Sequence, residues 1–456
     1  MEKRGFYFNT TNNQYFYDDV TGNVSFENKS PENNILYGNS SYKHKIFDKE
    51  QVKNTLDNIG ITQLTLIVTE ECNLRCKYCV YSGEYDNNRT HANNYMDINI
   101  AKRAVEKYLS YTNYYRKSNL LRIPTIGFFG GEPLLNFSLI KTIVEYSKMI
   151  YKGKINYNIT TNGTLLDENK IKFLVENNFS LFISLNGNKC ENDRLRIYSN
   201  GSGTYDSIMK NIALIYSKYP KYFDSNLKII SVFDNGTDLF ELKDFFEKNS
   251  LVKDKLSMLS KVIDFHTNWY ERYSDKENKK YKSQLKKLKE DFYNNLLTNN
   301  ELNIISKKLF SLPYFNVLNR STNIELSKYK SSIQPFSGSC IPGTKIAVDY
   351  RGLLHMCEKV NSMTPIGNVE KWLDYDKISS IVNMYNKYLG TNCINCPVQR
   401  MCPVCYKDVI DNKGQCDFEQ TNWCKLFIKD QIKVFSEIYS LMELGIDSKN
   451  IEKKIT

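Results

Sequence analysis

The chain has 456 residues, 41% of them hydrophobic, and a mean hydropathy of −0.50, which predicts a globular protein of two or three domains. No apolar run reaches the ~18 residues of a membrane span. Met1–Gly5 leads into no apolar signal core. We therefore expect a cytoplasmic protein without a membrane partner. The net charge of +11 could attract an acidic peptide or a nucleic acid, or it could serve only solubility. No nucleic-acid-binding motif is found in the sequence.

Residues 1–60 contain three short aromatic strands followed by a helix. The strands are expected at Phe6–Asn9, Gln14–Tyr17 and Asn23–Phe26, and the helix near Lys49–Asn58. We expect a small α+β module, which resembles the leader-binding modules of peptide maturases but lacks their full helical complement.

From residue 61 to 250 strands alternate with helices, which predicts a parallel sheet. Helices are expected near 97–109, 137–149, 167–176, 205–217 and 238–248. Strands are expected at Leu64–Thr69, Ile123–Phe129, Ile155–Thr160, Ser180–Leu185, Leu227–Phe233 and, as a sixth, Lys261–Phe265. This pattern predicts a partial (β/α)6 barrel, in which polar groups at the carboxyl ends of the strands form the site.

The first predicted strand leads into a loop with three cysteines. Cys72, Cys76 and Cys79 have the spacing C-x3-C-x2-C, with Tyr78 before the last. Three thiolates can hold three irons of a [4Fe–4S] cube and leave the fourth iron open for a ligand. The alternative is half of a zinc site or a redox CxxC pair. Structural zinc needs four ligands, and the nearest further candidate is His91.

The next three strands also end in polar or glycine-rich motifs. These are Gly130-Gly131-Glu132-Pro133, Thr160-Thr161-Asn162-Gly163 and Ser184-Leu185-Asn186-Gly187. Each motif alone predicts only a turn. Because parallel strands bring their carboxyl ends to one rim, the motifs together predict one site there. Arg196 follows ten residues after Asn186.

The cysteine motif, the GGEP element and the order of the later motifs resemble the radical SAM enzymes. The resemblance implies a [4Fe–4S] cluster on Cys72, Cys76 and Cys79. Its open iron would bind S-adenosylmethionine (AdoMet), which is cleaved to a hydrogen-abstracting 5′-deoxyadenosyl radical. The implied AdoMet contacts come from Tyr78, Gly130, Gly131, Glu132, Ser184, Asn186 and Arg196. Asn186 replaces the usual Asp, so its contact would lack a charge. For Arg196 the alternative is a surface ion pair.

Eight further cysteines follow residue 336. Their order is similar to the SPASM domain, which carries auxiliary [4Fe–4S] clusters, except that two rather than three residues separate Cys402 from Cys405. The resemblance implies a distal cluster on Cys393, Cys396, Cys402 and Cys424, and an inner cluster on Cys340, Cys357 and Cys405. Either Cys416 completes the inner cluster or one of its irons stays open. Taken alone, the CxxC pairs would favour zinc.

These expectations divide the chain into five parts. They are an N-terminal module (1–60), a radical SAM partial barrel (61–250), a mostly helical bridge (251–335), a SPASM domain with a cysteine-bearing hairpin (336–430) and a C-terminal helical tail (431–456).

We expect three [4Fe–4S] clusters, AdoMet, and a flavodoxin- or ferredoxin-like reductant. The resemblance implies modification of a ribosomally made peptide, with a thioether cross-link of the sactipeptide or ranthipeptide type. No catalytic residue can be named. The alternatives are an anaerobic sulfatase-maturating (formylglycine-generating) enzyme and, in another class, a zinc-binding peptide-binding or regulatory protein.

Overall fold

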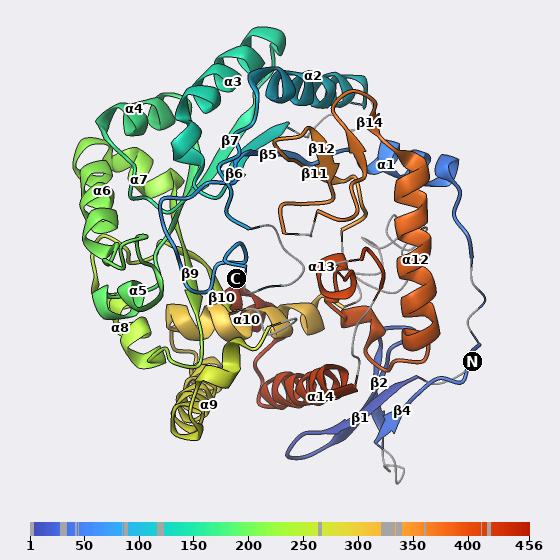
Figure 1. Cartoon of the computed structure of the whole chain (residues 1–456). Coiled ribbons are helices and arrows are strands. Elements are labelled where there is room, and N and C mark those ends of the chain that lie inside the picture. Colours follow the sequence, from blue (N-terminus) through green and yellow to red (C-terminus); the bar gives the residue numbers. More distant parts are fainter. Residues whose placement is uncertain are drawn as a thin grey trace. The chain divides into compact units, whose positions relative to one another are not determined.

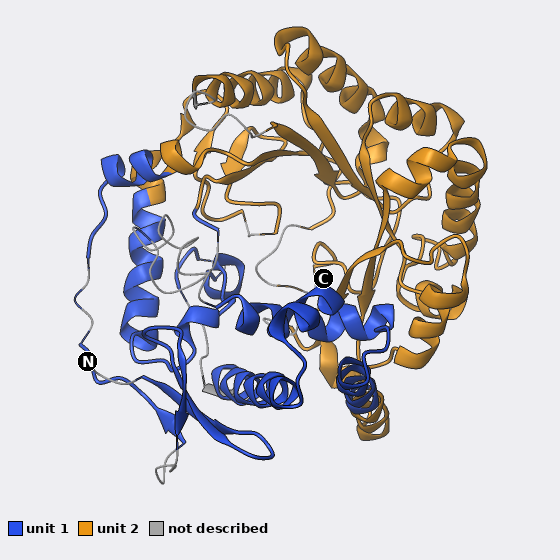
Figure 2. Ribbon diagram, turned by 180° about the vertical axis from the view of Figure 1, so that it is seen from behind, with its two compact units in different colours: residues 1–55, 285–341, 379–456 blue, residues 56–284, 342–378 orange. Residues whose placement is uncertain are grey.

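The computed structural model describes residues 4–27, 34–41, 43, 45–83, 85, 90–115, 123–262, 267–320, 333, 340–359, 362–411, 413–416 and 421–456. The chain forms two compact units (Figure 2). Unit 1 comprises residues 1–55, 285–341 and 379–456, and unit 2 comprises residues 56–284 and 342–378. Each unit therefore combines segments that are far apart in the sequence.

Unit 2 is built on a ten-stranded sheet with the order β10-β9-β8-β7-β6-β5-β11-β12-β13-β14. Its first six strands are parallel. They are β5 (Gln63–Thr69), β6 (Thr125–Gly130), β7 (Asn156–Thr161), β8 (Ser180–Ser184), β9 (Leu227–Phe233) and β10 (Leu256–Lys261). The predicted α/β fold is confirmed. The expected sixth strand falls largely on residues 263–265, outside the described residues, and β10 ends where that strand was expected to begin.

Helices cover the outer face of the parallel strands (Figure 1). They are α2 (Ile98–Tyr115), α3 (Phe137–Ile150), α4 (Glu168–Glu176), α5 (Lys189–Leu195), α6 (Tyr205–Lys218), α7 (Pro220–Asn226) and α8 (Leu239–Lys248). Local signals fix several of their starts. The side chain of Asp167 accepts a hydrogen bond from the Lys170 N–H at the start of α4, and Asp238 caps α8 in the same way.

The hairpin expected in the cysteine-rich domain extends this same sheet. Strand β11 (Lys345–Val348) pairs in parallel with β5, from Lys345 opposite Gln63 to Val348 opposite Leu66. Strands β12 (Leu353–His355), β13 (Gly367–Asn368) and β14 (Trp372–Leu373) follow as antiparallel neighbours. The strand that leads into the first cysteine motif therefore lies between β6 and a strand from the last quarter of the chain.

Unit 1 contains the N-terminal sheet, four antiparallel strands in the order β3-β2-β1-β4. The strands are β1 (Gly5–Asn9), β2 (Gln14–Asp18), β3 (Val24–Glu27) and β4 (Ile35–Leu36). Its longer helices are α10 (Ile304–Leu318), α14 (Thr421–Glu443) and α15 (Ser448–Ile455), while α1 (Lys49–Ile59), α9 (Asp275–Leu297) and α12 (Tyr375–Cys393) contribute parts.

An aromatic core joins the N-terminal sheet to helix α14. The ring centroid of Phe435 lies 5.2 Å from Phe6 and 4.6 Å from Tyr17, and all three side chains are fully buried. Such aromatic pairs stabilise beyond the area that they bury. The N-terminal strands and the C-terminal helices thus share one core. Among the described helices, none combines the length and apolar character of a membrane span.

Candidate cluster and cofactor site

The three cysteines of the first motif lie in the loop after β5, which we call the cysteine loop (residues 70–83). The GGEP element holds the start of this loop. The N–H of Gly131 donates to the Thr69 carbonyl (2.9 Å), and the N–H of Glu132 donates to the Glu71 carbonyl (2.8 Å). A Cβ atom on Gly131 would lie 2.2 Å from the Glu71 oxygen, and one on Gly130 would lie 2.3 Å from the Thr69 oxygen. The paired glycines therefore let two stretches of this chain approach each other.

The Glu132 carboxylate is fully buried and bonded within the protein. It accepts hydrogen bonds from the Leu134 N–H (3.0 Å), the Thr161 hydroxyl (2.7 Å) and the Asn162 N–H (2.7 Å). Burial raises the pKa of this carboxyl, although the three donors oppose the shift. Glu132 therefore connects the ends of β6 and β7.

Asn162 links the third rim motif to the cysteine loop. Its amide nitrogen lies 2.8 Å from the Asn73 side-chain oxygen and 3.9 Å from the Cys72 sulfur. The Asn73 amide in turn donates to the Thr164 hydroxyl (2.9 Å). Three of the motifs that the sequence placed on one rim are therefore brought together around Cys72.

The cysteine thiols are shielded from water. Burial, with a smaller contribution from the nearby Glu132, raises the pKa of Cys72 to about 12. Burial also raises the pKa of Cys79 to about 11. Such thiols stay protonated at neutral pH, and metal binding must displace their protons. The thiols of Cys76 and Cys79 lie close enough to Cys72 to interact with it electrostatically.

Arg196 brings a buried cation to the same place. Its side chain is 5% exposed, and its Nη1 donates to the Tyr78 hydroxyl (2.7 Å). Its Nε has no hydrogen-bond partner among the residues that the structure describes. Burial opposes the charge, yet Tyr78, Cys76 and Cys72 together raise the pKa of Arg196. The guanidinium therefore stays charged beside the cysteine loop, and its Nε–H is available to a ligand. Because the side chain is buried, the alternative of a surface ion pair does not apply.

The Asn186 side chain is bonded within the protein. It is fully buried, its oxygen accepts a hydrogen bond from the Val232 N–H (3.1 Å), and its nitrogen lies 3.3 Å from the Tyr78 hydroxyl. It thus holds the Tyr78 hydroxyl, which also receives Arg196. Ser184, the other predicted ribose contact, is half-buried at the carboxyl end of β8.

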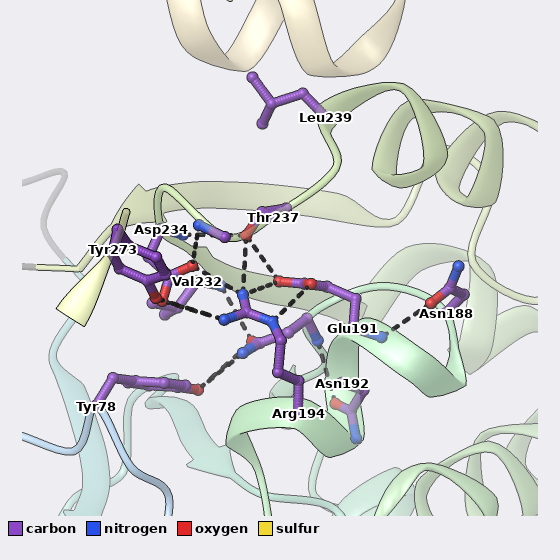
Figure 3. Close-up of polar contacts among 12 residues, drawn as sticks. Tyr78, Asn188, Glu191, Asn192, Arg194, Val232, Asp234, Thr237, Leu239 and Tyr273 are labelled. Atoms are coloured by element: carbon purple, nitrogen blue, oxygen red, sulfur yellow. Dashed lines mark hydrogen bonds and ion pairs between the residues drawn. The ribbon is translucent and has the colours of Figure 1, made fainter. Parts of the chain in front are cut away.

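An ion network centred on Arg194 lies beside these residues and was missed in the sequence. Nη2 of Arg194 lies 2.7 Å from the Glu191 carboxylate and 2.8 Å from the buried Asp234 carboxylate (Figure 3). The Tyr273 hydroxyl also donates to Asp234. A usable signal existed, because Asp234 and Thr237 directly follow β9, as the other rim motifs follow their strands. Arg194 is therefore neutralised within the protein, whereas Arg196 is not.

Four cysteines of unit 1 line one cavity, and they are the four assigned by resemblance to a distal cluster. The cavity is formed by Cys393, Cys396, Cys402 and Cys424 with apolar residues such as Val398 and Trp423. Burial raises the pKa of all four thiols, to about 12 for Cys393 and about 11 for Cys402. The four predicted thiols therefore line the same cavity.

The inner set is divided between the two units. In unit 1, the buried Tyr406 has its pKa raised by burial, then by Tyr385, and then by Cys405, Cys416 and Cys340. These three thiols therefore lie close enough to the Tyr406 hydroxyl to interact with it electrostatically. Cys357 follows β12 in unit 2. Within the described residues, no three His, Cys, Asp or Glu side chains are gathered as around a single metal ion.

Comparison with known proteins identifies the barrel. Residues 66–247 match the Radical SAM superfamily. The chain is 23% identical to the radical SAM cyclopropyl synthase TigE of Paramaledivibacter caminithermalis, over 86% of this chain and 78% of that protein. It is 30% identical to a cysteine-type anaerobic sulfatase-maturating enzyme of Clostridium novyi, over 41% of this chain and 48% of the relative.

The chain spans about half the length of some curated relatives that it matches, 50% and 48% for two of them. The solved structure of native anSMEcpe with bound AdoMet shares the fold, with a TM-score of 0.60 and 21% identity over 84% of this chain and 99% of that one. The chain therefore carries a radical SAM domain, and its named relatives are enzymes of that superfamily.

Proposed function

We propose that this chain is a radical SAM enzyme that modifies a ribosomally made peptide. The observation that carries the proposal is Arg196, a buried, charged guanidinium beside the cysteine loop with an unpartnered Nε. Burying a charge without a matching partner is costly. An anionic ligand at this place would supply the missing partner, and the AdoMet carboxylate suits the fork of an arginine.

The residues present fit a cluster and AdoMet. Cys72, Cys76 and Cys79 would hold the cluster, since their thiols interact and share one shielded loop. A reduced cluster with AdoMet would supply a 5′-deoxyadenosyl radical for hydrogen abstraction. The chain's own part is to hold the loop through Gly131 and Glu132, to orient Arg196 through Tyr78, and to exclude water from the thiols.

The auxiliary sites would hold two further clusters. The shared cavity supports Cys393, Cys396, Cys402 and Cys424 as one set. The thiols of Cys340, Cys405 and Cys416, all in unit 1, each raise the pKa of Tyr406, which supports Cys416 as a further ligand of the proposed inner set. We assign the first cysteine set to AdoMet chemistry and the two auxiliary sets to electron transfer with a flavodoxin- or ferredoxin-like donor.

A peptide substrate is favoured by the comparisons and by charge. A solved structure of the same fold, with a TM-score of 0.57, is an anSMEcpe complex with AdoMet and a peptide. The net charge of +11 would attract an acidic peptide. The N-terminal sheet is the proposed leader-binding module, and the bond we propose is a thioether between a peptide cysteine and a residue carbon.

A second candidate is a formylglycine-generating sulfatase maturase. Several curated relatives carry that name, among them one from Clostridium perfringens that is 24% identical over 78% of this chain and 91% of that relative. Against it stands Asn186, at a position where the resemblance implies Asp. The two candidates differ in product, because a thioether joins two residues whereas formylglycine alters one.

The test is anaerobic reconstitution followed by turnover with AdoMet, dithionite and candidate peptides. About twelve irons per chain are expected, with release of 5′-deoxyadenosine. Replacing Cys72, Cys76 and Cys79 with Ala should remove about four irons and all AdoMet cleavage, whereas Cys190→Ala, at an exposed cysteine, should change neither. A wild-type protein that holds zinc without sulfide would overturn the proposal, and a formylglycine product would select the second candidate.

A further inference from the structure

A buried carboxylate joins the N-terminal sheet to the distal cysteine segment (residues 393–402). Asp19, directly after β2, is 1% exposed. Its carboxylate lies 2.9 Å from Arg4 Nη2 and accepts hydrogen bonds from the Tyr17 hydroxyl (3.0 Å) and from the Arg400 N–H (3.2 Å). Arg400 lies two residues before Cys402. One carboxylate therefore holds the start of β1, the end of β2 and the cysteine segment.

The two arginines extend this contact over the segment. Nε of Arg400 donates to the Asp19 carbonyl (2.8 Å), and its Nη2 donates to the Val20 carbonyl. Nη1 of Arg4 donates to the carbonyl of Ile394, directly after Cys393. Both ends of the cysteine segment are thereby tied to the same carboxylate.

A second contact reaches the middle of the segment from β4. The Asn395 side chain accepts a hydrogen bond from the Ser40 N–H (3.0 Å) and donates to the Ser40 carbonyl (3.1 Å). The Gly38 N–H donates to the Asn395 carbonyl (3.1 Å), and a Cβ on Gly38 would lie 2.7 Å from the Asn395 side-chain oxygen. Asn395 lies between Cys393 and Cys396, so this contact fixes the CxxC turn itself.

From these contacts we propose that the N-terminal sheet is a structural part of the distal metal site, with Asp19 and Asn395 as positioning residues that hold Cys393, Cys396 and Cys402 at the cavity. Apart from Cys393, which ends helix α12, and a 3-10 turn at Gln399–Met401, the cysteine segment is irregular. Ligand geometry at such a site depends on the groups that hold the ligands in place. Residues of the N-terminal sheet would thus help the distal cysteines to retain their metal, although the two segments are 381 positions apart in the chain.

The inference rests on the proposed distal cluster, and the test separates the two. The reference variant Cys402→Ala should lower the iron of the reconstituted protein from about twelve to about eight per chain. If Cys402→Ala leaves the iron content unchanged, the proposed cluster is wrong at this site. In that case the positioning role of Asp19 and Asn395 is tested on the same cysteines through their uptake of zinc.

The positioning role of Asp19 is tested with Asp19→Asn, which keeps the shape of the side chain and removes its charge. About four of twelve irons should be lost, or released to an anaerobic chelator at least tenfold faster, while AdoMet cleavage persists. Any distal cluster that remains should have a more positive reduction potential, since a nearby negative charge is gone. Asp18→Asn is the matched control, because Asp18 caps only the Val20–Thr21 turn.

Asn395→Ala is a milder second variant, which removes the β4 contact without disturbing a buried charge. It should also speed iron release. Retention of about twelve irons at the wild-type release rate in both variants would overturn the proposal, even if their melting temperatures fell. A lower melting temperature with intact metal would mean that these contacts stabilise the fold alone.

Discussion

Arg194 and Arg196 are two residues apart, yet their guanidinium groups have different surroundings. Arg194 lies between the carboxylates of Glu191 and Asp234 at 2.7 and 2.8 Å. Arg196 meets a tyrosine hydroxyl and thiols, and its Nε has no partner. A charge that is already neutralised has little to offer a ligand, whereas a buried cation that forms no ion pair with the described residues can bind one. The difference assigns the proposed AdoMet contact to Arg196.

We predict that Arg196→Ala weakens AdoMet binding ten- to a hundredfold. A charge-assisted hydrogen bond is worth about 1.5–3 kcal/mol, and each 1.4 kcal/mol is a factor of about ten in affinity. Arg196→Lys should recover only part of the loss, because an ammonium lacks the planar fork. Equilibrium dialysis with the reconstituted protein measures the effect.

The control for this prediction is Arg103→Ala. Arg103 is about half exposed and pairs with Glu370 at the surface, so its loss should leave AdoMet affinity and iron content unchanged. Equal affinity of the Arg196→Ala and wild-type proteins would show that the unpartnered Nε serves another purpose.

At the scale of elements, the loop after β6 supports the loop after β5. The sequence suggested that the paired glycines admit a ligand, and the structure shows that they admit the backbone at Thr69 and Glu71. Glu132 continues this support toward β7 through Thr161 and Asn162. The GGEP element thus supports the cysteine loop through backbone hydrogen bonds.

We predict that Gly131→Ala abolishes AdoMet cleavage and removes about four irons per chain. The new Cβ would lie 2.2 Å from the Glu71 oxygen, which forces the cysteine loop to move. Gly201→Ala is the matched control. At Gly201 φ is +83° and no atom lies within 4 Å of an added Cβ, so the substitution should cost about 1–2 kcal/mol of stability and leave the iron in place.

At the scale of the whole molecule, the barrel is completed by a late part of the chain. Strand β11 pairs with β5 along four residues, so β5 is an interior strand rather than an edge. An unpaired β5 would expose a row of backbone donors and acceptors directly before the cysteine loop. The hairpin that carries Cys357 therefore also stabilises the barrel.

We predict that Ala347→Pro lowers the melting temperature and the iron content together. Ala347 is fully buried and lies between β5 and β12. Proline removes a ladder hydrogen bond from an interior strand, where it is not tolerated. Because β5 leads into the cysteine loop, the first cluster should be affected with the fold. A wild-type melting temperature in this variant would show that β11 is dispensable for the barrel.

The sequence by itself determined the features that depend on contacts between residues close together in the chain. Short apolar runs separated by helical segments placed the five main barrel strands near their observed positions, because such runs are typical of buried parallel strands. The starts of α4 and α8 lie close to the predicted bounds, and the Asp167 and Asp238 side chains fix them through contacts within three residues. The C-x3-C-x2-C spacing predicted a metal-binding loop, since three ligands on one short segment need no distant partner.

The tertiary structure decided what depends on contacts between distant segments. No local pattern shows that β11 pairs with β5, that Asp19 meets Arg400, or that Arg194 rather than Arg196 is neutralised. These outcomes follow from packing of buried surfaces, in which each charge must find its partner across the fold. The cysteine spacing could therefore suggest which residues bind metal, while the folded chain determined what holds them in place.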